Sequence, residues 1–379
     1  MSIRTVVSLV LASQLVLIGM ACSQAPGERI RVIREVTLSR HHVSPYAITR
    51  TPDGGYVITG STGVPDSHGW ATRLDSSGKQ LWEYFAGPPD DMTPNVNRID
   101  GAVVLSGDRT LLCGVEGAPR EHSPARLVLL DTHGAVSEVR DLFPEGDKVK
   151  YNVWSAKCLR WGDGIAVLAS ASGGGKGGGW LLKLDRSGLV VWQRFPLLGR
   201  ARDVLESQDH SLLVLSSDEV SANNSRLDRL DTEGNVLLTR KFRGKACFVR
   251  PHSPADSTIR VTADEEPDGP SKFWQVQDSY PDGSFKDVRK PITLARFEPT
   301  TGYELADHSL VIFGGGFGGG WVAAVIRIYK NSATDEIPLE PLHQSGWFND
   351  ATPTSPREFA TVRQTLDFRP ILAWISIEK

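Results

Sequence analysis

The sequence contains few residues of the kinds that would indicate nucleic-acid binding or metal binding. Its 42 Lys and Arg nearly balance 45 Asp and Glu, so the formal net charge is −3. A chain this close to neutral lacks the basic surface needed to bind phosphate backbones, so we expect no nucleic-acid partner. Only 4 cysteines occur among 379 residues, with no CxxC pair and no Cys/His spacing of a zinc site. We therefore expect no metal and no cofactor.

Three of the cysteines, Cys113, Cys158 and Cys247, lie in the body of the chain. Each falls in a segment that we expect to be an inner strand, which predicts three buried small side chains. A disulfide between Cys113 and Cys158 is the alternative. In an oxidising compartment an odd number of cysteines leaves at least one thiol unpaired.

The N-terminal segment has the features of an export signal. Arg4 precedes an apolar run over residues 6–18, and Gly19-Met20-Ala21-Cys22 follows it. This arrangement resembles a bacterial lipoprotein signal, although Gly19 stands where such signals usually have Leu. We expect a signal peptide over 1–22 with Cys22 as the lipidated residue, and a tether over 23–28. Ordinary signal cleavage and a retained membrane anchor are the alternatives.

Ser23 bears on the expected location, because a Ser after the lipidated Cys favours the outer membrane. We therefore expect the protein to be periplasmic or cell-surface, anchored to the outer membrane through Cys22 and in contact with the membrane only through the lipid.

An aspartate in a turn recurs just before an apolar strand. It stands at Asp53, Asp108, Asp163, Asp209, Asp256 and Asp307, and a seventh unit without Asp fits at Ser355-Pro356-Arg357. Neighbouring copies lie about 46 to 55 residues apart, which is the length of one blade of a β-propeller.

A second aspartate turn follows each first one at a similar distance. Asp75, Asp131, Asp185 and Asp231 are each followed three residues later by Gly, and weaker copies occur at 280–283 and 329–332. We expect each carboxylate to cap the turn amides while the Gly adopts positive φ. Two turn motifs that recur together predict a repeated antiparallel sheet.

Short strands fit between these turns. The first unit predicts strands over 46–50, 56–61, 70–74 and 80–85. Trp82 and Trp192 hold equivalent places just past the second turn. We expect these tryptophans to pack between neighbouring sheets.

The repeats predict an all-β fold, a seven-bladed β-propeller over 29–379. The expected blades are approximately 44–87, 96–142, 151–197, 200–243, 245–290, 292–340 and 345–379. The last unit ends on a strand at 371–377 without an outer partner, so the alternating segment 29–39 should complete that blade and close the ring.

The pattern over 54–82 resembles bacterial exported propeller repeats of the quinoprotein-like and WD-repeat-like kind. The resemblance implies the architecture and says little about activity. A bound quinone is not expected, because the Asp–Gly spacing differs and no adjacent cysteine pair is present.

Two glycine-rich runs, over 173–180 and 313–321, fall between the second and third strands of their units. We expect hairpin loops there. Since both would lie on one face, they could close over a partner.

The innermost strands of a propeller line its central channel, so their polar residues are the candidate binding residues. These are Arg50, Arg98, Trp154, Lys157, Arg202 and Arg250.

No catalytic residue can be assigned. The function that we expect is that of a monomeric, non-catalytic envelope lipoprotein binding a protein or glycan partner, as a scaffold or an inhibitor. The alternative is a propeller enzyme of the lactonase, lyase or hydrolase type, with its site at the channel mouth.

Overall fold

The computed structural model describes most of the chain in segments. They are residues 30–39, 42–62, 68–86, 98–115, 123–144, 151–173, 176–197, 199–207, 209–217, 224–243, 245–251, 259–264, 271–279, 284–287, 292–294, 297–307, 309–317, 321–328 and 341–377. The predicted signal peptide, Cys22 and the tether lie outside these residues. No helix within the described segments is long and apolar enough to cross a membrane.

The described residues form strands and one short 3-10 turn, Ser106–Asp108 (η1). The strands are β1 Ile30–Thr37, β2 Val43–Arg50, β3 Tyr56–Thr62, β4 Gly69–Leu74, β5 Gln80–Phe85, β6 Arg98–Val104, β7 Thr110–Val115, β8 Ala125–Leu130, β9 Val136–Leu142, β10 Tyr151–Trp161, β11 Gly164–Gly173, β12 Lys176–Leu184, β13 Val190–Leu197, β14 Arg200–Glu206, β15 Leu212–Ser217, β16 Asn224–Leu230, β17 Val236–Arg243, β18 Lys245–Pro251, β19 Ile259–Asp264, β20 Ser271–Ser279, β21 Ser284–Asp287, β22 Ile292–Leu294, β23 Phe297–Glu304, β24 Leu310–Phe317, β25 Trp321–Ile328, β26 Pro341–Ser345, β27 Trp347–Ser355, β28 Glu358–Gln364 and β29 Pro370–Ile377.

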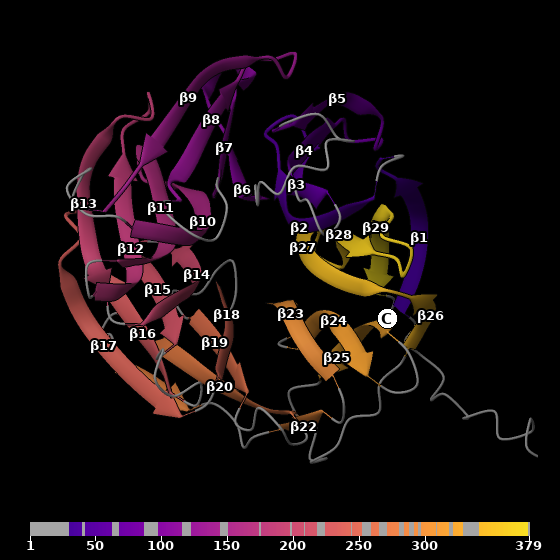
Figure 1. The fold of residues 1–379 in the computed structure, drawn as a ribbon. Helices are drawn as coiled ribbons and strands as arrows, with labels where there is room; N and C mark the ends of the chain where they lie inside the picture. Colours follow the sequence, from indigo (N-terminus) through magenta and orange to yellow (C-terminus); the bar gives the residue numbers. More distant parts are fainter. Residues whose placement is uncertain are drawn as a thin grey trace, which may run out of the picture.

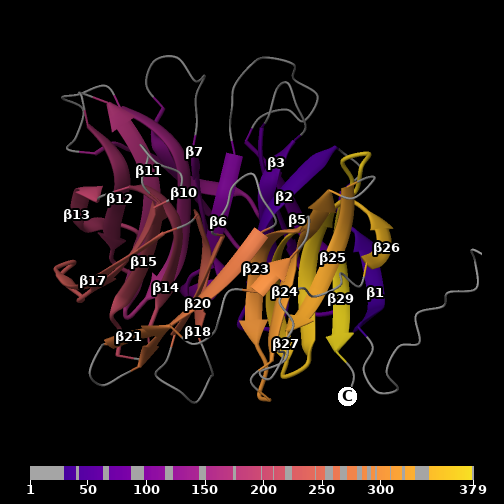
Figure 2. The same ribbon diagram turned by 90° about the horizontal axis from the view of Figure 1, so that it is seen from below.

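These strands pair antiparallel into sheets that follow the chain order. Six sheets are built from consecutive strands, namely β2–β5, β6–β9, β10–β13, β14–β17, β18–β22 and β23–β26. One further sheet is composite, with the order β1-β29-β28-β27. The first strand of each unit lies toward a common centre, and the later strands lie progressively outward (Figure 1). Seen from the side, the sheets stand around that centre (Figure 2). The predicted all-β propeller fold is confirmed.

The two ends of the described chain are joined by pairing of β1 with β29, as the sequence predicted. Ile30 lies opposite Ile377 and Arg34 lies opposite Trp374. The Arg34 guanidinium lies 3.8 Å from the centroid of the Trp374 ring and donates a hydrogen bond to the Ser77 carbonyl of the first sheet. The pairing therefore covers the edge of β29 and ties the composite sheet to the first one.

The aspartate turns have the predicted chemistry. The Asp75 Oδ1 atom accepts hydrogen bonds from the Ser77 and Lys79 amides at 2.8 and 2.9 Å, and Gly78 has φ 79°. These bonds lower the pKa of Asp75, with the Ser77 hydroxyl contributing most. The turns that begin at Asp131, Asp185 and Asp231 repeat the arrangement.

The turn glycines also receive the side chain of a neighbouring sheet. A Cβ at Gly134 would lie 2.8 Å from Trp82, and one at Gly234 would lie 2.6 Å from Trp192. Each tryptophan belongs to the preceding sheet, so it packs against a backbone position that only Gly leaves open. The predicted packing role of Trp82 and Trp192 is confirmed.

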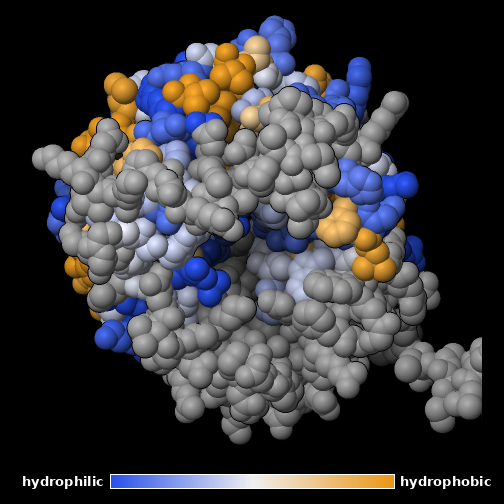
Figure 3. Space-filling view, in the orientation of Figure 1, coloured by the Kyte–Doolittle hydropathy of each residue, from blue (hydrophilic) through white to orange (hydrophobic). Residues whose placement is uncertain are grey.

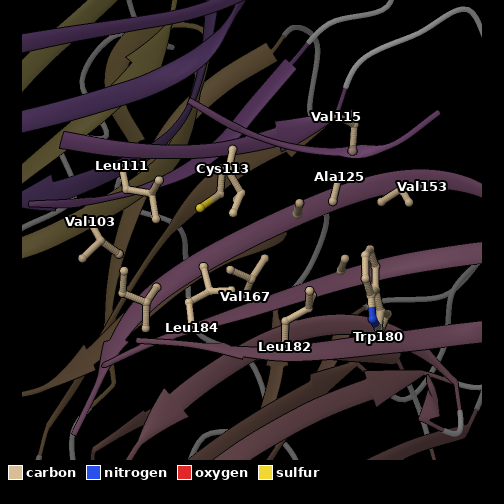
Figure 4. Close-up of a cluster of buried hydrophobic side chains, with 14 of the residues drawn as sticks. Val103, Leu111, Cys113, Val115, Ala125, Val153, Val167, Trp180, Leu182 and Leu184 are labelled. Carbon is tan, nitrogen blue, oxygen red and sulfur yellow. The ribbon is translucent and has the colours of Figure 1, made fainter. Parts of the chain in front are cut away.

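The core between the second and third sheets is apolar and contains a disulfide. Trp180, Leu182 and Leu184 of β12 pack there with residues of β7 and β11 (Figure 4). Cys113 of β7 and Cys158 of β10 are bonded, with 6.0 Å between their Cα atoms. The expectation of three unbonded buried cysteines was wrong for these two, because adjacent sheets bring their thiols together. The Cys247 side chain lies outside the described part.

The structure corrects the interpretation of both glycine runs as loops. In the first run, β11 extends to Gly173 and β12 begins at Lys176, and Ser172 pairs with Gly177. In the second run, Gly314–Gly316 pair with residues of both neighbouring strands. A Cβ at Gly315 would lie 2.3 Å from the Trp347 ring of the next sheet, so this glycine permits a close approach between sheets.

One predicted boundary also differs from the structure. Strand β22, expected at the start of the sixth unit, pairs instead with β20 of the fifth. Since β20 is nine residues long, it accommodates both β21 and β22 along one edge.

Candidate functional site at the channel mouth

Every inner strand contains one extra residue at an equivalent place near its start. Each interrupts the pairing with the next strand, as a β-bulge does. The seven bulge residues are Tyr46, Asp100, Trp154, Arg202, Cys247, Thr300 and Asn349. The inner strands all begin at one end of the channel, which we call the channel mouth. Because bulges change the direction of side chains, these seven residues determine which side chains face this mouth.

Two carboxylates, of which Asp100 is buried and Asp350 is partly buried, tie the inner strands to each other. The Asp100 Oδ2 atom accepts a hydrogen bond from the Ala156 amide of the next sheet at 2.9 Å, and Asp350 accepts one from the Ile48 amide at 3.1 Å. Ala156 and Ile48 both stand two residues after their bulges, so the donors hold equivalent places, whereas Asp100 is itself a bulge residue and Asp350 follows one. They satisfy amides at strand edges that have no ladder partner.

Asp100 is the most strongly buried of these acids, at 5% exposure. Burial raises its pKa, while Arg98 and the Ala156 amide act in the opposite direction. The Arg98 Nε atom lies 2.8 Å from Asp100 Oδ1. The carboxyl group is thus engaged on both oxygens, as expected for a structural tie between strands.

Two cation–aromatic pairs lie at the same mouth. The Arg98 guanidinium lies 5.7 Å from the Tyr46 ring centroid, and that of Arg200 lies 4.9 Å from Trp154. In both pairs the aromatic residue is a bulge residue and the Arg stands two positions before the bulge of the next sheet. Tyr46 and Trp154 are 37% and 36% exposed, so each pair also faces solvent.

The structure brings together three of the six residues predicted from the sequence. Arg98, Trp154 and Arg202 lie near the starts of their strands, and Arg202 donates to the Ser217 hydroxyl at 2.9 Å. Lys157 lies further along β10 and donates to the Arg202 carbonyl at 3.3 Å.

The other two predicted residues do not join this group. Arg50 lies at the far end of β2 and contacts the Pro353 carbonyl at 3.5 Å. Arg250 is in β18, but its side chain lies outside the described part.

Sequence reasoning missed Tyr46, Asp100 and Arg200 at this mouth. Each is an ordinary residue in an inner strand, and nothing in its local sequence marks a bulge. The repeat carries the missing signal, because bulges recur at the same phase of each unit. The surface of the molecule is hollowed near the centre of the ring of sheets (Figure 3).

The acids described at the mouth already have partners. Asp100 and Asp350 already accept amides, and Lys157 lies 3.9 Å from Asp203. Across the described ranges, no group of three or more His, Cys, Asp or Glu residues is placed to hold a metal ion. What the mouth presents is guanidinium groups over aromatic rings, which suits planar anions and ring-shaped ligands.

The arrangement of sheets around a channel defines a β-propeller. No protein-family model matches the sequence, and no curated protein does so either. Among solved structures, the Dos1 propeller superposes with a TM-score of 0.55 at 9% identity, over 88% of this chain and 78% of that one.

Two further solved structures superpose less closely. Sqt1 from Chaetomium thermophilum has a TM-score of 0.47 at 13% identity, covering 88% of this chain and 83% of that one. Drosophila Semaphorin 1b has a TM-score of 0.48 at 10% identity, covering 92% and 88%. Similarity at this level of identity shows the fold alone.

Proposed function

We propose that this chain is an exported, lipid-anchored propeller of seven blades that binds a carboxylate-bearing protein or glycan at the mouth where its inner strands begin. The two exposed cation–aromatic pairs, Arg98 over Tyr46 and Arg200 over Trp154, carry the proposal. A guanidinium has five N–H donors, so Arg98, although its Nε atom pairs with Asp100, and Arg200 can each donate to a planar carboxylate. Binding without catalysis fits the engaged state of the neighbouring acids.

Two other observations support the closed propeller and the proposed export of the protein. The inner strands of successive sheets contact one another around the whole circle, including β27 with β2 and β18 with β23. The Cys113–Cys158 disulfide fits an oxidising compartment, as expected for an exported protein.

The binding proposal is tested with defined anionic probes. Purified protein is titrated calorimetrically with oligogalacturonate, a carboxylated glycan, and separately with a poly-glutamate peptide, so that the two sources are distinguished. The double variant Arg98→Gln/Arg200→Gln should weaken binding at least tenfold, and binding should fall as salt rises. Arg109→Gln, in an exposed turn at the opposite face, is the matched control and should bind normally. Equal affinities for all three proteins, or no binding of either probe, would refute the proposal.

The address is tested separately by Cys22→Ser. If Cys22 is acylated, the variant leaves the membrane fraction on cell fractionation. A variant that stays membrane-bound at full length contradicts the lipid anchor.

A further inference from the structure

Two seams between neighbouring sheets carry an arginine over an aromatic bulge residue, and the seam of the last and first sheets has small polar side chains in both places. At the seam of the first and second sheets, Arg98 covers the bulge residue Tyr46, and at the seam of the third and fourth, Arg200 covers Trp154. At the seam of the last and first sheets the bulge residue is Asn349. The residue in the place of the Arg is Ser44, which stands two positions before the bulge of β2.

A pocket occupies the space beside this small side chain. Its volume is about 500 Å³, within the range of about 300–1,000 Å³ typical of small-molecule sites. The lining residues are Ser44, Gly346, Trp347, Asn349, Gln364, Thr365, Leu366 and Phe368. They come from the starts of two inner strands, the end of β28 and the β28–β29 turn, so the pocket opens on the same face as the channel mouth.

Backbone contacts hold the walls of the pocket in place. The Trp347 ring rests against Gly315, where a Cβ would lie only 2.3 Å away. The Val43 amide donates to the Phe368 carbonyl at 2.9 Å, and the His42 Nδ1 atom lies 3.0 Å from the Asp367 carbonyl oxygen. The turn is therefore fastened to the start of β2, and the pocket is formed before any ligand arrives.

Phe368 is an unusual residue for its backbone position. Its φ is 58°, and its amide donates to the Thr365 carbonyl just as the Gly78 amide donates to Asp75 in the β4–β5 turn. Gly is favoured at this left-handed position, and a bulky side chain costs about 1–2 kcal/mol there. The ring is nonetheless 43% exposed, so its own burial does not explain the choice. Such strain is typical of residues retained for a function.

We propose that this pocket binds a neutral sugar unit. No lining side chain carries a charge, which disfavours an ionic ligand. Trp347 and Phe368 supply aromatic surface for the C–H face of a pyranose ring. The amides of Asn349 and Gln364 each offer a donor and an acceptor for its hydroxyl groups, and Ser44 and Thr365 add hydroxyls. The pocket does not include Arg98 or Arg200, so this inference does not depend on the channel-mouth proposal.

The experiment uses isothermal titration with cellotetraose, maltotetraose and chitotetraose as neutral probes. At least one should bind the wild-type protein, and binding should be insensitive to salt. Ser44→Arg places a large side chain in the pocket, at the position that Arg98 and Arg200 hold in two other sheets, and should weaken binding at least tenfold. Ser76→Arg adds the same charge in an exposed turn at the opposite face and should bind as the wild type does.

Phe368→Gly separates binding from folding. This change removes the ring and relieves the backbone, so the thermal midpoint should stay the same or rise while sugar binding is lost. Oligogalacturonate binding that depends on Arg98 and Arg200 should persist in both pocket variants, which distinguishes failure here from failure of the channel-mouth proposal. The inference is overturned if no neutral probe binds at millimolar concentration, or if Ser44→Arg and Phe368→Gly bind as tightly as the wild type.

Discussion

Gly134→Ala should destabilise the propeller by more than its backbone conformation alone requires. Gly134 has φ 83°, and Gly107 has φ 70°, so Ala at either position costs about 1–2 kcal/mol for the left-handed conformation. A Cβ at Gly107 would have no atom within 4 Å, whereas one at Gly134 would lie 2.8 Å from Cγ of Trp82. Trp82 is 6% exposed and has little room to move. Overpacking of this kind costs about 1–3 kcal/mol more.

The comparison is made by urea unfolding followed by tryptophan fluorescence. Gly107→Ala should lower the free energy of unfolding by about 1–2 kcal/mol, and Gly134→Ala by about 2–5 kcal/mol. In the Gly134→Ala background, Trp82→Leu should cost less than it does alone, because the smaller side chain relieves the clash. Equal losses for the two glycine variants would show that Trp82 does not wedge the sheets together.

Three other perturbations test separate parts of the fold. Replacing both Cys113 and Cys158 by Ala opens a 45-residue connection, and should cost about 4 kcal/mol of unfolding free energy by the chain-entropy estimate; an unchanged urea midpoint would contradict the disulfide. Burial of Asp209 opposes its ionisation, but hydrogen bonds from Ser211 and Arg229 outweigh burial and lower its pKa to about 2. Its contribution to stability should therefore be full above about pH 4 and be lost as pH falls toward 2. The urea midpoint of Asp209→Asn should accordingly fall less between pH 5 and pH 2 than that of the wild type. Deleting residues 1–39 uncovers the edge of β29, and should produce aggregation on size-exclusion chromatography; a monomer as stable as the full chain would refute closure by β1.

The sequence predicted most of what depends on local chemistry. An Asp followed three residues later by Gly has its hydrogen-bond partners within the same turn, so Asp75 and Gly78 could be interpreted without any tertiary information. The strands expected over 56–61 and 70–74 depend on equally local sequence. Pairing of 30–37 with the last sheet was predictable because a propeller has one missing strand at one end and one spare strand at the other.

The glycine runs show where local reasoning fails. Glycine is common in loops because it is flexible, and in strands where a neighbouring chain approaches closely. Gly315 belongs to the second group, but its reason is Trp347, which lies 32 positions further along the chain and in another sheet. A disulfide between Cys113 and Cys158 depends in the same way on how two sheets meet.

The candidate site depends on contacts between neighbouring sheets more than other parts of the molecule do. Tyr46 and Trp154 become mouth residues only because a bulge turns them there, and Arg98 and Arg200 become their partners only because the next sheet supplies them. Ser44 is likewise an ordinary residue in its own strand, and it lines a pocket only because β27, β28 and the β28–β29 turn of another sheet lie beside it. In a repeat protein, therefore, a comparison of equivalent positions in successive sheets shows which side chains meet at each seam, and this cannot be obtained from any one strand alone.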